Sequence, residues 1–217
     1  MKPGLDAFYE FISHPVRLWS RLALVALAVP LVLTFTQPLW NITMVAPQYP
    51  NGLSLDIYTH KVEGGRNGAD IQEINTLNHY IGMAHIDRVA LSDLDWLPFA
   101  FGGLTILALR VAAIGTISSL IDLTVVSLYF SLFAMARFVY RLWLLGHNLD
   151  PMAPVKMTPF TPPVFGTEHI ANFTVTSLPR LASGYAAVFV VGVCLLTAWH
   201  LIIGRREAAR LLDAAKP

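Results

Sequence analysis

Cysteine is nearly missing from this chain, whose one example, Cys194, stands inside an apolar run. A single cysteine excludes an internal disulfide, a CxxC metal site and the CxxCH attachment of a c-type haem. Any bound metal would therefore be held by His, Met, Asp or Glu side chains.

Charged residues are also scarce, at 13% of the 217 residues, while 55% are hydrophobic. A soluble domain has about a quarter of its residues charged, so this composition indicates a membrane protein. The net charge of +1 gives no electrostatic footprint for DNA or RNA. We therefore expect no nucleic-acid partner.

Common catalytic signatures are missing as well. The sequence has no nucleophile elbow, P-loop, dinucleotide-binding glycine motif or HExxH pair, and each of these marks a catalytic or cofactor site. We expect a protein that is not an enzyme.

Long apolar runs are what the sequence does contain. No charged residue interrupts the chain between Leu22 and Leu55, and about 20 apolar residues suffice to cross a hydrocarbon core of about 30 Å. Pro30 should kink this first helix, which we expect to be a retained anchor and not a cleaved signal peptide. The runs predict four transmembrane helices, over residues 19–39, 96–114, 119–145 and 182–203.

Basic residues predict how these helices are oriented. They gather at both termini and beside the connection between the second and third helices: Lys2, Arg17, Arg21, Arg110, Arg205 and Arg206. Cytoplasmic segments carry an excess of Lys and Arg, so residues 1–18 and 204–217 are predicted to be cytoplasmic. The loops 40–95 and 146–181 would then face the periplasm, and the chain would lie in a bacterial inner membrane.

The first of these loops is predicted to form a small α+β module. Residues 40–44 and 53–57 alternate apolar and polar side chains, which predicts a β-hairpin with Asn51-Gly52 as its turn. Asp70 and Glu73 resemble a capping box, and apolar residues at helical spacing then predict a short helix that ends at Gly82.

The second loop holds five prolines between Pro151 and Pro163. It should be extended and stiff, with few backbone donors for a sheet. The predicted fold is thus an α-helical integral membrane protein with four transmembrane helices, a small periplasmic α+β module (β-hairpin plus short helix) and an extended proline-rich loop.

The two loops carry most of the histidines and methionines, and imidazole with soft thioether suits copper, particularly Cu(I). A structural alternative places His79 at a helix C-terminus, lets Asn75 and Asn78 bond to the strands, and uses the methionines as packing. The candidate metal ligands form two groups, His79, Met83 and His85 in the first loop and His147, Met152 and His169 in the second.

Four charges stand within or at the ends of the predicted spans. Arg110 and Asp122 could pair across the tight connection between the second and third helices, or Asp122 could relay protons. Arg137 and Arg141 are one helical turn apart and face the same way. They could anchor the helix to lipid phosphate or hold an acidic partner, with lipid the favoured reading.

The segments "APQYPNGLSLDIY", "DIQEINTLNHYIGM" and "LDPMAPVKMTPFTPPVFGTEHIANF" resemble motifs of an uncharacterised family of small bacterial polytopic membrane proteins. The resemblance covers most of residues 40–175. That family is associated with loci for copper handling and nitrous-oxide respiration, so the resemblance implies a copper-related accessory role without assigning catalytic residues. The shared motifs contain Asn75, Asn78, His79, Gly82, Met83, Asp150, Pro151 and Asn172.

Three functional readings follow. The first is an accessory protein in copper handling or in the assembly of a copper or redox enzyme, with the lipid bilayer and other membrane or periplasmic redox proteins as partners. The second is a structural transmembrane subunit of a respiratory or photosynthetic electron-transfer complex, which braces a periplasmic partner such as a cytochrome. A transporter is the third, suggested by Asp122 and Arg110 but disfavoured because no inverted repeat is detectable.

Overall fold

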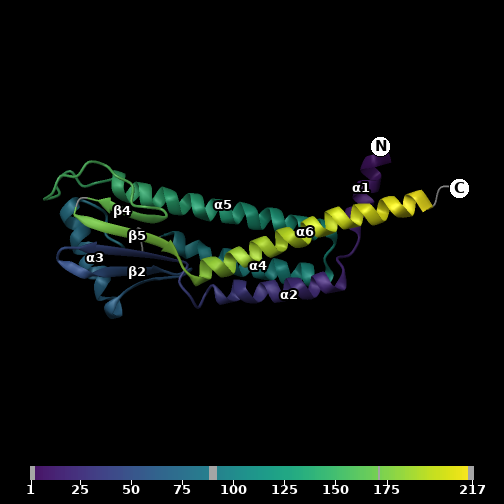
Figure 1. Ribbon diagram of the computed structural model, residues 1–217, viewed down its shortest axis with the longest axis horizontal. Helices are drawn as coiled ribbons and strands as arrows, with labels where there is room; N and C mark the ends of the chain where they lie inside the picture. The colour runs from purple at the N-terminus through teal and green to yellow at the C-terminus, as the bar shows by residue number, and fades with distance from the viewer. Residues whose placement is uncertain (1–2, 88–91, 171, 215–217) are drawn as a thin grey trace. The chain divides into compact units, whose positions relative to one another are not determined.

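The computed structural model describes residues 3–87, 92–170 and 172–214 (Figure 1). The chain divides into two compact units. We call Met1–Val32, Phe101–Ser131 and Tyr185–Pro217 the helical unit, and Leu33–Ala100 with Leu132–Gly184 the sheet unit.

Long helices dominate the chain. Three segments have the length and apolar composition of membrane spans: Asp93–Ile114, Ile117–His147 and Leu181–Ile203. The prediction of a mostly helical protein with membrane-length helices is thereby confirmed. The helices are α1 (Pro3–Ser13), α2 (Leu18–Leu33), α3 (Ala69–Ile81), α4 (Asp93–Ile114), α5 (Ile117–His147) and α6 (Leu181–Ala214).

The first predicted span differs from the helix observed. α2 ends at Leu33 and not at residue 39, and its 16 residues make it about 24 Å long, short of a core of about 30 Å. The Thr36 N–H and hydroxyl both bond to the Leu33 carbonyl, at 3.0 and 2.8 Å. Pro38 follows and has no N–H with which to continue a helix.

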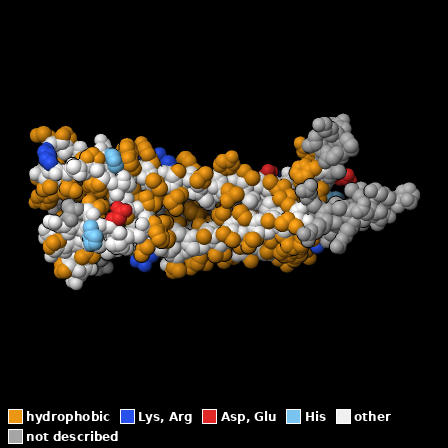
Figure 2. All heavy atoms as spheres, turned by 45° about the horizontal axis from the view of Figure 1, so that its top comes forward, with side chains coloured by type: hydrophobic (Ala, Val, Ile, Leu, Met, Phe, Trp, Pro, Cys, Tyr) orange, Lys and Arg blue, Asp and Glu red, His pale blue; other side chains and the backbone are white. Residues whose placement is uncertain are grey.

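The surfaces of the long helices are apolar. Phe99 is 81% exposed, Tyr129 71% and Leu132 69%, and hydrophobic side chains cover the helices in the face that Figure 2 shows, with few charges between them. Soluble proteins rarely expose continuous apolar surface of this kind. Lipid is the environment in which these side chains are stable.

In the helical unit, the segment before α2 pairs with the short connection between α4 and α5. The Val16 N–H donates to the Gly115 carbonyl at 3.2 Å. Arg21 donates to the Ala113 carbonyl at 3.1 Å, which satisfies one of the carbonyls left open at the end of α4. Deeper in the unit, the Thr124 and Thr197 hydroxyls lie 2.6 Å apart and join α5 to α6.

The sheet unit is built on one antiparallel sheet of five strands, in the order β3-β2-β1-β5-β4. The helix α3 packs against it through a core of Leu53, Leu55 and Ile74. The strands are β1 (Trp40–Ala46), β2 (Tyr49–Ile57), β3 (Val62–Gly64), β4 (Gly166–Ile170) and β5 (Phe173–Pro179), and a 3-10 turn (Arg66–Gly68) precedes α3.

Both long loops contribute to this sheet, because β1 pairs along its length with β5, from Trp40 opposite Pro179 to Val45 opposite Thr174. Strands that share backbone hydrogen bonds lie on the same side of a membrane. Two membrane-length helices, α4 and α5, separate the two loops in sequence.

The hairpin turn lies elsewhere than predicted. Residues 47 and 48 form it, since Ala46 pairs with Tyr49, whereas Asn51-Gly52 falls inside β2. The register shifts between Met44 and Ala46, and Gly52 has a φ of +78°. This glycine permits an irregularity in the strand, and not a turn.

The proline-rich loop also differs from its prediction, because its second half forms β4 and β5. Pro163 is the last proline of the cluster, so the residues from 164 to 178 regain their N–H groups. Burial alternates along β5, where Val175 and the polar Ser177 are buried and Leu178 is exposed. Only the part of the loop before β4 lies outside the sheet.

The predicted helix at 69–81 is observed, and Gly82 ends it with a φ of +78°. The prediction of a capping box is wrong, because Gly68 is the N-cap and no side chain caps the helix. Asp70 and Glu73 bond instead to the sheet, Asp70 to the Ser54 N–H at 2.8 Å and Glu73 to the Tyr49 hydroxyl.

Candidate functional site

The two loops meet where α3 ends. The Gly82 carbonyl accepts the Asp150 N–H at 2.8 Å, and the Val155 N–H donates to Tyr80 at 2.9 Å. A Cβ on Gly82 would lie 2.9 Å from the backbone of Asp150 and from the Ala153 side chain, so only glycine lets the loops approach this closely. Segments far apart in sequence thus form one surface.

The two asparagines of α3 hold the chain that follows it. Asn75 Oδ1 accepts the Ile86 N–H at 2.7 Å, and its amide donates back to the Ile86 carbonyl at 3.3 Å. Asn78 Nδ2 donates to the Ala84 carbonyl at 3.3 Å. These bonds fix residues 84–86. The structural alternative expected the two asparagines to bond to the strands instead, and that expectation is wrong.

This fixed segment brings His79 and His85 together. Both are exposed, and their ring centres lie 6.4 Å apart. A metal–nitrogen bond of about 2.0 Å plus about 1.1 Å to the ring centre places two imidazoles on one metal at most about 6.2 Å apart. The observed separation of 6.4 Å lies slightly above that limit.

The other four candidate ligands are not brought to this pair as one cluster. Met83 lines an apolar recess in the sheet unit. The His147 ring stacks on Trp143 with centres 4.5 Å apart, and His169 Nδ1 lies 3.0 Å from the Thr174 hydroxyl. Over residues 3–87, 92–170 and 172–214, no three or more His, Cys, Asp or Glu side chains gather where they could hold a metal.

Asp150, Pro151 and Asn172 lie in the second loop. Asp150 Oδ1 accepts the Met152 N–H at 2.8 Å, and the Met152 side chain is 85% exposed. The Pro151 carbonyl accepts the Lys156 ammonium. Asn172 is exposed in the turn between β4 and β5.

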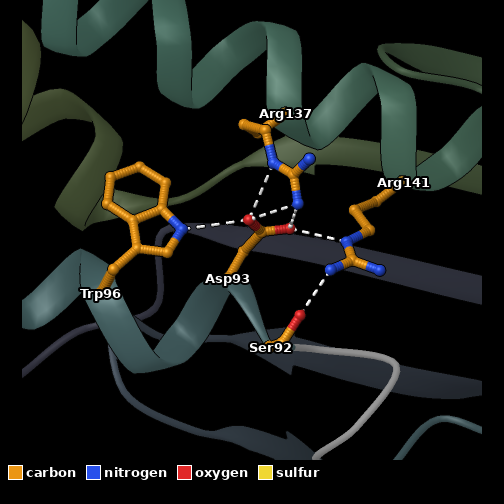
Figure 3. A network of polar contacts seen from close by, with 5 residues as sticks. All are labelled: Ser92, Asp93, Trp96, Arg137 and Arg141. Carbon is orange, nitrogen blue, oxygen red and sulfur yellow. Dashed lines mark hydrogen bonds and ion pairs between the residues drawn. The ribbon is translucent and has the colours of Figure 1, made fainter.

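A charged cluster lies at the start of α4 (Figure 3). Arg137 Nε donates to Asp93 Oδ1 at 2.9 Å, and Arg141 Nε donates to Asp93 Oδ2 at 2.7 Å. The Trp96 indole adds a third bond to the carboxylate at 3.0 Å, and Arg141 also donates to Ser92. The acidic partner that the two arginines could hold is thus a residue of the same chain.

Asp93 is not among the residues predicted from the sequence, although a signal for it exists. Two arginines four residues apart in a predicted span require a counter-charge, and Asp93 is one of two carboxylates in the first turn of α4. Two guanidinium groups share the one carboxylate of Asp93, so the cluster keeps one surplus positive charge.

Arg110 and Asp122 do not form the ion pair considered from the sequence. Both are exposed in the helical unit, and together with Ser119 they line a recess of about 90 Å³. No ion pair joins them in the part of the chain that the structure describes.

An apolar recess of about 90 Å³ lies between the sheet, α3 and the end of α5, all within the sheet unit. Its lining includes Met44, Leu77, Leu145 and Val175. Asn78 is the polar residue of this lining. No sequence signal pointed to this recess.

Asp70 ties the turn before α3 to the sheet. The carboxylate is 2% exposed, and it accepts the Ser54 N–H and the Arg66 guanidinium. Burial alone would raise the pKa of Asp70, but these two hydrogen bonds and the charge of Arg66 outweigh it and hold that pKa below its usual value. Arg66 and Asn67 have positive φ angles of 50° and 57°, a conformation that is common for glycine, tolerated by asparagine and rare for arginine.

No family model, curated protein or solved structure gives a significant match to the chain. Function is therefore inferred from the residues themselves. Those that the fold brings together are the His79–His85 pair, the Asp93 cluster and the apolar recess, and all three lie in the sheet unit.

Proposed function

We propose that the chain is a non-enzymatic accessory protein of a bacterial inner membrane, in copper handling or in the assembly of a copper or redox enzyme. In this proposal α2 is a fourth, short span, both termini are cytoplasmic, and the sheet unit faces the periplasm. The excess of basic residues at the termini supports that orientation.

The observation that carries the copper proposal is the approach of His79 and His85. Their ring centres are 6.4 Å apart, and Asn75 and Asn78 hold the segment that bears His85. Neutral imidazole is a good ligand for copper. Two exposed ligands suit a protein that receives and passes on an ion, because an open site lets a partner complete the coordination.

Anaerobic Cu(I) titration of the purified chain against a chromophoric chelator tests this proposal. We expect binding tighter than micromolar, and a loss of more than about tenfold in affinity for His79→Ala and for His85→Ala, since losing a ligand costs more than losing an outer-shell partner. His169→Ala is the matched control, because its ring bonds to Thr174, and it should bind as the intact chain does. Absence of submicromolar binding in the intact chain would end the proposal.

A structural subunit of an electron-transfer complex is the second candidate. Exposed apolar side chains on the second loop favour it, since Met152 is 85% and Phe165 69% exposed outside the membrane-length helices. Apolar groups exposed in this way suit contact with another protein. Native mass measurement after mild detergent extraction separates the two candidates, because a lone monomer contradicts the subunit.

A further inference from the structure

The apolar recess of the sheet unit is suited to a ligand that is itself apolar. Its volume of about 90 Å³ has room for roughly six water-sized groups, but water needs several polar partners to stay in a cavity. Asn78 is the polar residue of the lining, and its amide is already bonded to the Ala84 carbonyl. Hydrocarbon fits these walls better than water does.

The end of α5 connects this recess with the membrane surface. The helix has 31 residues, so it is about 46 Å long and extends beyond a core of about 30 Å. Aromatic pairs characteristic of the interface lie near that point: Trp40 packs on Phe138 at 5.0 Å and Tyr140 on Trp143 at 6.2 Å. Leu142 and Leu145, in the recess wall, follow directly.

An anionic group has a place to bind beside the recess. Arg137, Arg141 and Leu145 are spaced four residues apart and follow one side of the helix, with a rise of about 6 Å between neighbours. Each guanidinium has five N–H donors, and the bonds to Asp93 and Ser92 use only some of them. The surplus positive charge of this cluster favours a phosphate or a carboxylate.

We infer that the recess binds the hydrocarbon chain of an anionic amphiphile, a phospholipid of the bilayer or a free fatty acid, whose headgroup lies at Arg137 and Arg141. The inference is independent of copper. It makes the sheet unit a lipid-binding module at the membrane surface.

Photo-crosslinking of the full-length chain in liposomes tests the inference. In one arm the bilayer contains phosphatidylglycerol with a diazirine in one acyl chain, and in the other it contains a diazirine-bearing palmitate. After irradiation and proteolysis, the label is located by peptide mass spectrometry. We expect label on α3, Ala69–Ile81, in addition to the membrane-length helices, which serve as an internal standard.

Val175→Phe should reduce the label on α3 by at least roughly fivefold, because a phenyl ring in the recess takes the volume of the ligand. Val45→Phe is the matched control: Val45 is 39% exposed on the neighbouring strand, and its side chain points to the other face of the sheet from Met44, which lines the recess. It should leave the label unchanged. Leu145→Phe closes the recess from α5 and replaces Val175→Phe if that variant does not fold.

The outcome of the two arms identifies the source of the chain. Label on α3 from phosphatidylglycerol alone indicates a bilayer lipid, label from palmitate alone indicates a free fatty acid, and label from both indicates a site for either. Unlabelled α3 in both arms, with labelled membrane helices, overturns the inference. Equal label on α3 in Val175→Phe, Leu145→Phe and Val45→Phe overturns it as well.

Discussion

Asp93→Asn is expected to destabilise the detergent-solubilised chain by about 2–3 kcal/mol. For a chain of this size, that difference lowers the melting temperature by roughly 5–10 °C. The substitution leaves Arg137 and Arg141 without the carboxylate that both contact, at 2.9 and 2.7 Å. A thermal melt of the purified protein measures the effect.

The size of this effect depends on burial. Exposed ion pairs contribute about 0–1 kcal/mol, whereas removing one partner of a buried pair costs about 3–5 kcal/mol. The Asp93 side chain is 17% exposed, and three side chains bond to its two oxygens. We therefore expect a value near the buried limit, reduced for partial access of water.

Glu168→Gln is the matched control, since it removes the same charge from an exposed position on β4. Its melting temperature should stay within about 1 °C of the parent, as exposed substitutions usually do. Adding Arg137→Gln to Asp93→Asn should recover part of the loss, because one unpaired guanidinium disappears. Equal melting temperatures for Asp93→Asn and Glu168→Gln would show that the cluster is not a stabilising contact.

Asp70→Asn is expected to destabilise the sheet unit by about 2 kcal/mol at neutral pH, because a hydrogen bond to a charged group contributes about 1.5–3 kcal/mol. The neutral amide can still accept the Ser54 N–H but loses the charge that holds Arg66. That residue belongs to a turn with positive φ angles, so the turn should loosen first. Thermal melts and hydrogen exchange at residues 65–70 measure the two effects.

The pH dependence of this difference follows from the lowered pKa of Asp70. A carboxylate with a lower pKa in the folded state than in the unfolded chain adds stability above the unfolded value of about 4. That contribution is lost as the pH falls through the folded pKa. Melts of the parent and of Asp70→Asn should therefore converge below about pH 4. A gap that stays constant from pH 7 to pH 3 would contradict the assignment.

Local patterns in the sequence predicted the local elements. The helical spacing of apolar residues and the glycine after them were enough to place α3 and its end at Gly82. Alternation placed β1 and β2. The turn between them was misplaced because Asn51-Gly52 is a strong turn signal, and nothing nearby shows that Gly52 serves an irregularity inside the strand.

Contacts between distant segments could not be read in this way. The pairing of β1 with β5 and the approach of Asp150 to Gly82 depend on tertiary packing, which composition and periodicity do not encode. The same holds for the Asp93 cluster. Two arginines in a predicted span indicate that a counter-charge is needed, but they do not indicate which residue supplies it. Of the six candidate ligands, the fold gathers only His79 and His85 closely, because the others are fixed by neighbours such as Trp143 and Thr174.

Both long loops contribute to one sheet, and we propose that this sheet lies on the periplasmic side of the membrane. With Cys194 replaced by alanine, His60→Cys and Met152→Cys place single thiols at exposed positions, one in each loop. We expect a membrane-impermeant maleimide to label both variants in cells whose inner membrane is intact. Labelling of either thiol only after that membrane is broken would contradict it.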